Sequence, residues 1–332
     1  MTRSNRFDWL VFLALGFMWG SSYLFIKIGV EEGGLPPFTL IAGRLGIGLL
    51  ILATIVAVAR ESLPRKPRVY GHLLVMAVIN ISLPFFLITF AEQSVESSLA
   101  AVLNGTVPLF VIVIAALFLR DEPITVNRLV GLVLGFIGVV VLTSRGLGSL
   151  GSSSFIGEVA LIGSAVSYAA GAVYARRNVQ GLRPMIPAVF QVGFAFVITT
   201  VLALVLERPL DLRPNPQAIL AVVWLGIVGS AFAYLAFFRL LKNWGATRTS
   251  MVAYLLPVWG IVLGALVLSE PIDARLLAGT ALVIGGVALV NSKYGSRRLY
   301  GRAGAGGPAT VAAQAPVPPP SDARRAEAAS DR

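Results

Sequence analysis

The stretch from Ser97 to Thr143 is SSLAAVLNGTVPLFVIVIAALFLRDEPITVNRLVGLVLGFIGVVVLT, and its pattern recurs from Thr249 to Asn291 as TSMVAYLLPVWGIVLGALVLSEPIDARLLAGTALVIGGVALVN. Each copy has an apolar run containing a proline, then Glu-Pro, then a second apolar run with spaced glycines. Pro108 corresponds to Pro257 at a distance of 149 positions, and Glu122 corresponds to Glu270 at 148. Repetition over such a distance predicts a protein built from two similar halves.

The composition indicates a membrane protein. Of the 332 residues, 56% are hydrophobic and 13% are charged, whereas a soluble domain carries about 25% charged residues. The chain has no cysteine and one histidine, His72, which argues against disulfides, thiolate metal sites and histidine-based catalysis. We therefore expect no metal, no cofactor and no enzymatic activity. The net charge of +11 follows the loops, so no nucleic-acid partner is expected.

Ten apolar runs are long enough to cross a bilayer core of about 30 Å as helices. In the first half they cover about Trp9–Ile28, Phe38–Ala59, Gly71–Ala91, Leu99–Leu119 and Leu129–Thr143. In the second half they cover about Phe155–Ala175, Ile186–Leu206, Ile219–Leu241, Thr249–Leu268 and Leu276–Val290.

The loop charges predict the orientation of these spans. Lys and Arg are frequent in the N-terminus, in the even-numbered loops and at the start of the tail, whereas the opposite side has only Arg145, Arg208, Arg213 and Arg275. Basic loops stay in the cytoplasm, so both termini are expected to be cytoplasmic. Five spans per repeat is an odd number, so the second repeat should enter the membrane inverted relative to the first, as in many secondary transporters.

The chain is thus predicted to be an all-α integral membrane protein with ten transmembrane helices in two inverted five-helix repeats. Residues 1–146 form the first repeat and residues 147–293 form the second. Residues 294–332 are rich in Ala, Gly and Pro and are predicted to be a disordered cytoplasmic tail, because this composition does not bury a core.

The order of several motifs resembles a known family. They are Trp19-Gly20-Ser21-Ser22 followed by Lys27, Pro36 followed by Arg44, and Pro108 followed by Glu122, Gly131 and Gly138. Together they are similar to the EamA-type branch of the drug/metabolite transporter superfamily, over about Trp9 to Ser292. The resemblance implies a ten-helix bundle in the inner membrane that moves small metabolites such as amino acids, nucleosides or drugs without ATP. No phosphate-binding GxxxxGK[ST] loop occurs in the chain.

The fourth and ninth spans are expected to be kinked at the same point. Proline in mid-span frees the carbonyl four residues earlier, here that of Asn104 or Ala253. Asn104 lies on the helix face of Pro108, and a polar group at mid-depth favours a cavity. The kinks at Pro108 and Pro257 are therefore predicted to line a cavity, with a packing kink as the alternative.

Further polar and aromatic residues at mid-depth are candidate substrate ligands. Their alternative role is local packing or helix–helix hydrogen bonding. Gln191 is interpreted as such a packing group. The candidates are Trp19, Ser22, Asn80, Tyr168, Tyr234 and Tyr254.

Charged residues near the membrane receive separate interpretations. Lys27 is expected to extend toward Glu31 and Glu32, whereas Arg44 lies deeper and is predicted to hold an anionic substrate group or a carboxylate such as Glu92.

Glu122 and Glu270 are interpreted as caps of the helices that follow them. No acid is centred in a span, and Glu92 and Glu158 belong to outer ends. This pattern favours facilitated transport, or coupling through an interfacial acid, over a buried-carboxylate proton pump.

The sequence hypothesis is a multi-pass transporter of the cell (inner) membrane that works by alternating access on a small molecule, with export favoured. Its partners are the lipid bilayer and the substrate, and it is a monomer or weak homodimer. The alternatives are a non-transporting scaffold or sensor and a membrane-embedded lipid-modifying enzyme. A cavity with little charge suits a zwitterionic or uncharged metabolite.

Overall fold

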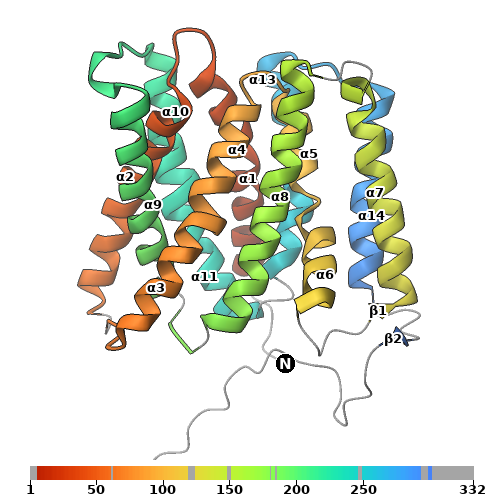
Figure 1. Cartoon of the computed structure of the whole chain (residues 1–332), viewed down its shortest axis with the longest axis horizontal. Helices are drawn as coiled ribbons and strands as arrows, with labels where there is room; N and C mark the ends of the chain where they lie inside the picture. The colour runs from red at the N-terminus through yellow and green to blue at the C-terminus, as the bar shows by residue number, and fades with distance from the viewer. Residues whose placement is uncertain are drawn as a thin grey trace, which may run out of the picture. The chain divides into compact units, whose positions relative to one another are not determined.

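The computed structural model describes residues 6–60, 63–118, 124–147, 151–179, 181–183, 185–245, 249–292 and 298–300. These residues form ten helical spans long and apolar enough to cross a membrane (Figure 1). The all-helical fold in two five-span repeats is confirmed. The predicted disordered tail lies outside the described residues except at 298–300, and Glu122 lies outside them as well.

Four spans of the first repeat are single helices or a pair of helices, and the third span contains a π turn. The first repeat consists of α1 (Arg6–Val30), α2 (Pro37–Val58), α3 (Pro67–Ala77) with η1 (Val78–Ser82) and α4 (Leu83–Ala91), α5 (Ser97–Asn104) with α6 (Val107–Phe118), and α7 (Val126–Leu147). The strand β1 (Ile124–Thr125) before α7 pairs antiparallel with β2 (Arg298–Tyr300).

The second repeat has the same order of spans. It consists of α8 (Ser153–Asn178), α9 (Met185–Leu206), α10 (Pro216–Gly226) with η3 (Ile227–Phe232) and α11 (Ala233–Trp244), η4 (Ser250–Tyr254) with α13 (Leu255–Leu268), and α14 (Ala274–Asn291). A short 3-10 turn, η2 (Pro209–Asp211), precedes α10.

The two repeats run in opposite directions through the bundle. In Figure 1, α1 begins at the lower end, near the N-terminus, whereas α8 begins at the upper end. This is the inverted arrangement that an odd number of spans requires. The side on which the termini lie in the cell remains a prediction.

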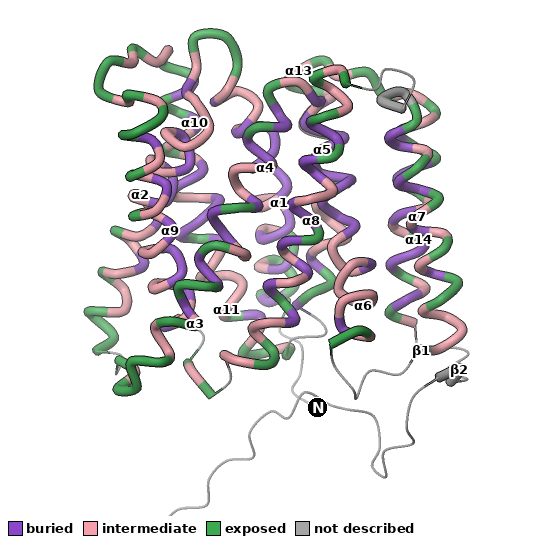
Figure 2. The backbone as a smooth tube through the Cα atoms, viewed as in Figure 1, coloured by how far each residue is buried: buried purple, intermediate pink, exposed green. Residues whose placement is uncertain are grey.

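Apolar side chains cover the outer surface of the bundle. Leu50, Leu117 and Leu266 are 70%, 75% and 78% exposed, and exposed positions run along the outward faces of the helices (Figure 2). In contrast, every residue of α5 is buried. A surface of exposed leucines with a buried interior is what hydrocarbon as solvent requires.

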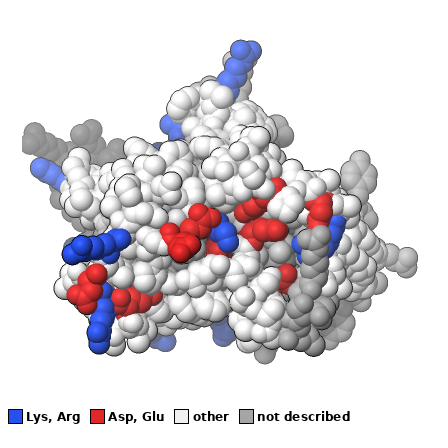
Figure 3. Space-filling view, turned by 90° about the horizontal axis from the view of Figure 1, so that it is seen from above, with Lys and Arg blue, Asp and Glu red and all other residues white. Residues whose placement is uncertain are grey.

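The upper end of the bundle carries acidic side chains. Figure 3 views this end and shows several groups of Asp and Glu on it, interspersed with Lys and Arg. Three acids, Glu207, Glu270 and Asp273, accept hydrogen bonds from backbone N–H groups at helix N-termini. The carboxylate of Glu207 accepts hydrogen bonds from the backbone N–H groups of Phe38 and Thr39 at 2.9 and 2.7 Å, and so caps α2.

Glycines join α7 to α14, the fifth spans of the two repeats, which pack mainly against each other. A Cβ atom on Gly286 would lie 2.6 Å from the backbone oxygen of Gly131 and 2.6 Å from the backbone nitrogen of Gly135. Real Cβ contacts are not this short, so this interface requires glycine at the crossing.

We expect Gly286→Ala to destabilise the protein, because the added methyl group forces two backbones apart at a cost of about 1–3 kcal/mol. The matched control is Gly285→Ala, since a Cβ there meets no atom within 4 Å and alanine favours the helix by up to ~1 kcal/mol. Thermal unfolding of the purified protein in detergent measures both. Equal melting temperatures for the two variants would contradict the interface.

Candidate functional site

The third span of each repeat contains a π turn at the same position. The turns η1 and η3 begin at Val78 and Ile227, which are 149 positions apart. In η1 the backbone N–H of Leu83 bonds to the oxygen of Val78, and in η3 the N–H of Ala233 reaches the oxygen of Val228. Such i to i−5 bonds are rare and often mark functional sites.

The first π turn is followed by a proline whose missing N–H leaves an acceptor open. Pro84 stands five residues after Ile79, so Ile79 receives no backbone bond from it. The hydroxyl of Ser167 in α8 donates to the Ile79 oxygen at 2.6 Å. A side chain of the second repeat thereby satisfies a backbone group of the first.

The fourth spans are interrupted just before their prolines. Helix α5 ends at Asn104 and α6 begins at Val107, one residue before Pro108. In the second repeat the 3-10 turn η4 changes to α13 after Tyr254, close to Pro257. A Cβ on Gly105 would lie 3.0 Å from Cγ of Pro257, so the two interruptions meet inside the bundle.

A chain of hydrogen bonds joins both repeats beside these interruptions. The Asn104 side-chain amide donates to the Tyr23 hydroxyl at 2.5 Å, and the Ser164 hydroxyl lies 3.4 Å from the Asn104 Oδ1 acceptor. Tyr23 is buried in α1. The sequence prediction did not include Tyr23 among the candidate ligands, although Tyr23 directly follows Ser22 in the first span.

Arg44 of α2 is buried between the two π-turn spans. Its side chain is 4% exposed, and its guanidinium lies 4.3 Å over the ring of Phe85 in α4. A Cβ on Gly229 in η3 would lie 3.6 Å from Nη2 of Arg44 and 2.8 Å from the Ser22 hydroxyl. The small residues of η3 therefore make room for Arg44 beside Ser22.

Two predicted tyrosines lie near Arg44. Tyr168 and Tyr234 both interact with it electrostatically, as does Glu92. Both tyrosines are deep among the helices and yet keep some accessible surface. Tyr234 occupies the repeat position of Phe85, 149 residues later, so equivalent aromatic residues of the two repeats flank one arginine.

The remaining candidates are placed differently. Asn80 lies within η1 and its amide bonds to Gln191 at 3.3 Å. Trp19 packs against Phe237 of α11 with ring centroids 5.6 Å apart. Tyr254 bonds to the Val287 oxygen and accepts from Asn291 on α14. The structure thus gathers Ser22, Arg44, Tyr168 and Tyr234, and it sets Trp19 and Tyr254 against other helices.

Lys27 has partners other than those expected from the sequence. Its ammonium donates to the backbone oxygens of Glu92 at 2.7 Å and Val95 at 3.0 Å, rather than extending to Glu31 and Glu32. These carbonyls follow the C-terminus of α4, where a cation is favoured by the helix dipole. Lys27 therefore has a structural role, as expected, but its partners are the backbone oxygens of Glu92 and Val95.

Glu270 also has a different partner. Its carboxylate accepts from the backbone N–H groups of Ser97 at 2.7 Å and Ser98 at 2.9 Å, so it caps α5 of the other repeat. Helix α14, which directly follows Glu270, is capped by Asp273 through the N–H of Leu276. The expectation that Glu270 caps the helix after it is therefore wrong. The N-terminus of α5 lies within hydrogen-bond distance of the Glu270 carboxylate instead.

Glu92 follows α4 at an outer end of the span, as predicted, but it is fully buried. Neither carboxylate oxygen has a hydrogen-bond partner among the described residues. Lys27, Glu270 and Arg44 all act on it electrostatically. The interfacial acid is thus removed from water, which the sequence pattern did not indicate.

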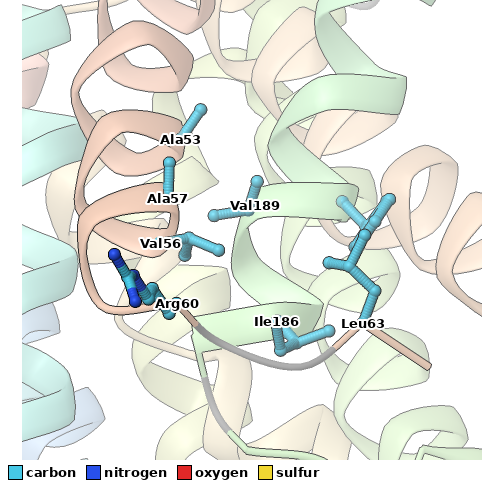
Figure 4. Close-up of a pocket in the computed structure, with 8 residues that line it drawn as sticks. Ala53, Val56, Ala57, Arg60, Leu63, Ile186 and Val189 are labelled. Carbon is cyan, nitrogen blue, oxygen red and sulfur yellow. The ribbon is translucent and has the colours of Figure 1, made fainter.

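Two apolar grooves lie elsewhere, between α2 and α9. One has a volume of about 300 Å³ and is lined by Ala53, Val56 and Phe190 among others (Figure 4). The other, of about 440 Å³, is lined by Gly43, Gly46 and Phe196 among others. None of the predicted ligands lines either groove. Among the described residues, no cluster of His, Cys, Asp or Glu is arranged to hold a metal.

Comparison with known proteins identifies relatives over nearly the whole membrane portion. The EamA-like transporter family matches residues 8–144 and 155–292. The chain is 30% identical to the uncharacterized transporter YvbV of Bacillus subtilis, over 86% of this chain and 90% of that protein. It is also 30% identical to the uncharacterized inner membrane transporter YedA of Escherichia coli, over 85% and 90%.

A solved structure described only as "Crystal structure of protein" has the same fold, with a TM-score of 0.62, 22% identity, and coverage of 89% of this chain and 100% of that one. Each repeat matches the family model separately, in agreement with the two halves of the fold. The chain belongs to the EamA-like transporter family and is a multi-pass membrane protein.

Proposed function

We propose that this protein is a secondary transporter of the inner membrane that moves a small metabolite by alternating access, with export favoured. An amino acid, a nucleoside or a drug-like solute is the expected cargo, and the working unit is a monomer or weak homodimer. The observation that carries the proposal is the meeting of broken helices from both repeats beside Asn104, Arg44 and their neighbours. The name of the E. coli relative supports the inner membrane.

Helix packing supports a state closed at the upper end. There α5 packs against α13 and α1, and a Cβ on Gly260 would overlap Ala101. In the lower half, the described residues of α6 do not pack closely against those of η4. The described residues of α3 likewise do not pack closely against those of α11. A bundle tight at one end and looser at the other is what alternating access requires.

Site-directed labelling tests this state, since the chain has no cysteine. We expect a membrane-impermeant maleimide applied on the N-terminal side to label Phe238→Cys, which lies in α11 beside Tyr234. Ser98→Cys should be protected from reagent on the opposite side, because Ser98 is buried under the Glu270 cap. Adding Glu270→Gln should expose it. Rapid labelling of Ser98→Cys alone would contradict a closed upper end.

Transport in proteoliposomes tests the candidate site with a labelled amino-acid panel. Asn104→Ala leaves the buried Tyr23 hydroxyl without its partner, so we expect a loss of about tenfold or more in rate. Trp19→Ala should have a smaller effect, because Trp19 packs against Phe237.

The matched control is Asn178→Ala, because among the described residues the Asn178 amide bonds only to Tyr174 of its own helix. Transport unchanged by both Asn104→Ala and Trp19→Ala would place the substrate elsewhere. No transport by the wild type would favour a scaffold or sensor.

Glu92 is the acid on which coupling to protons would depend. Burial raises the pKa of Glu92 well above its ordinary value, while Lys27 acts in the opposite direction. The native state therefore keeps the proton at pH values where the unfolded chain has released it. Stability from this group is lost as the pH rises above the ordinary glutamate pKa of about 4.3.

Glu92→Gln removes this loss, because glutamine does not ionise. We expect the variant to melt at a higher temperature than the wild type at pH 8, with the difference shrinking toward pH 4.5. Thermal unfolding in detergent across this range measures it. A variant less stable than wild type at pH 8 would mean that Glu92 is ionised and paired with Lys27.

A further inference from the structure

We propose that Arg44 recognises a carboxylate on the transported solute, so that the substrate class is small monocarboxylates with an apolar or aromatic body. This inference rests on the proposed function, because it assigns the cargo of that same site. It narrows the expectation of a zwitterionic or uncharged cargo to solutes that carry a carboxylate. The argument depends on the unpaired donors of Arg44, on the position of Phe85 and on the use of Lys27 elsewhere.

The guanidinium of Arg44 lacks a partner for its donors. It is 4% exposed, and its Nε has no hydrogen-bond partner. Among the described residues, none forms an ion pair or hydrogen bond with any nitrogen of Arg44. A buried guanidinium without an anion is costly inside a membrane. Retaining it is understandable if a ligand supplies the missing acceptor.

The contact between Arg44 and Phe85 is a cation–π contact, which uses none of the hydrogen-bond donors of Arg44. Arg44 Cζ lies 4.3 Å from the centroid of the Phe85 ring, and the N–H donors lie in the guanidinium plane and point outward from its edge. A carboxylate binds at this edge through two parallel hydrogen bonds. The backbone beside Arg44 is fixed, since a Cβ on Gly226 would lie 3.1 Å from the Arg44 oxygen.

The neighbouring groups suit the rest of such a solute. The Tyr23 hydroxyl is occupied by Asn104, but the described residues provide no hydrogen bond to the hydroxyls of Tyr168 or Tyr234. Both rings keep accessible surface. They therefore offer additional donors to an anion and apolar faces to its body.

Arg44 supplies one positive charge, which limits the ligand to a single negative charge. Lys27 acts on Glu92 together with Arg44, and its ammonium is bound to two backbone oxygens. Gly193 stands at the repeat position of Arg44, so the second repeat adds no arginine. A phosphate dianion would keep one charge uncompensated.

Matched ligand pairs test the proposal on the purified full chain. The probes are hexanoate, 3-phenylpropanoate and L-leucine, each beside its amide, with phenyl phosphate as the dianion. We expect at least one carboxylate to bind, measured by thermal shift and by direct titration, and its amide and phenyl phosphate to bind at least tenfold more weakly. The wild-type comparison needs no variant, so it holds even if a substitution fails to fold.

Arg44→Gln should weaken carboxylate binding by about tenfold to a hundredfold, the range for a charge-assisted hydrogen bond. Arg44→Lys should restore part of it, since a lysine keeps the charge without the planar pair of donors. Arg239→Gln is the control, because Arg239 of α11 pairs with Asp8 of α1. Carboxylates that bind no better than their amides, or equal binding by Arg44→Gln, would overturn the proposal.

Proteoliposome uptake of the same pairs separates the two proposals. Transport of amides without preference for carboxylates would leave the transporter standing and reject the role of Arg44. Movement of no solute in this panel or the amino-acid panel would reject both.

Discussion

The constraint on which this structure depends is that backbone polar groups in hydrocarbon must find partners within the chain. Continuous helices meet it by themselves, whereas the broken third, fourth, eighth and ninth spans do not. The exposed ends are satisfied by long-range side chains. Ser167 donates to Ile79, Lys27 donates to the oxygens of Glu92 and Val95, and Glu270 accepts from Ser97 and Ser98. The break at η1 and the ends of α4 and α5 thereby become points where distant segments are joined.

Several of these joins cross from one repeat to the other. Glu207 and Glu270 belong to the second repeat and cap α2 and α5 of the first, and both lie at the acidic end of the bundle. The α7–α14 pair makes a further connection through glycines. The polar cluster beside Arg44 likewise draws Tyr168 and Tyr234 from the second repeat to α2. Neither repeat holds the whole cluster.

The sequence was sufficient for the features that depend on local pattern. Span length gave ten helices, repetition gave two halves, and Pro108 and Pro257 marked where the fourth spans are interrupted. What it missed depends on neighbours. A helical face says which way Tyr23 or Trp19 points but not which helix lies there, so neither the bond between Tyr23 and Asn104 nor the packing of Trp19 on Phe237 could be predicted. Glu270 was assigned the next helix because sequence distance hides that α5 is nearer.

The second π turn has no proline after it, and this difference from the first has a dynamic consequence. Pro84 fixes η1, since its ring and missing N–H prevent a regular helix from forming there. In η3 the corresponding position is Ala233, which accepts either geometry. A π turn holds one surplus residue, so straightening η3 would rotate α11 by about 100° about its axis. Pro84 thus holds η1 in its π geometry, whereas η3 is able to straighten, and this change would turn α11 together with Tyr234.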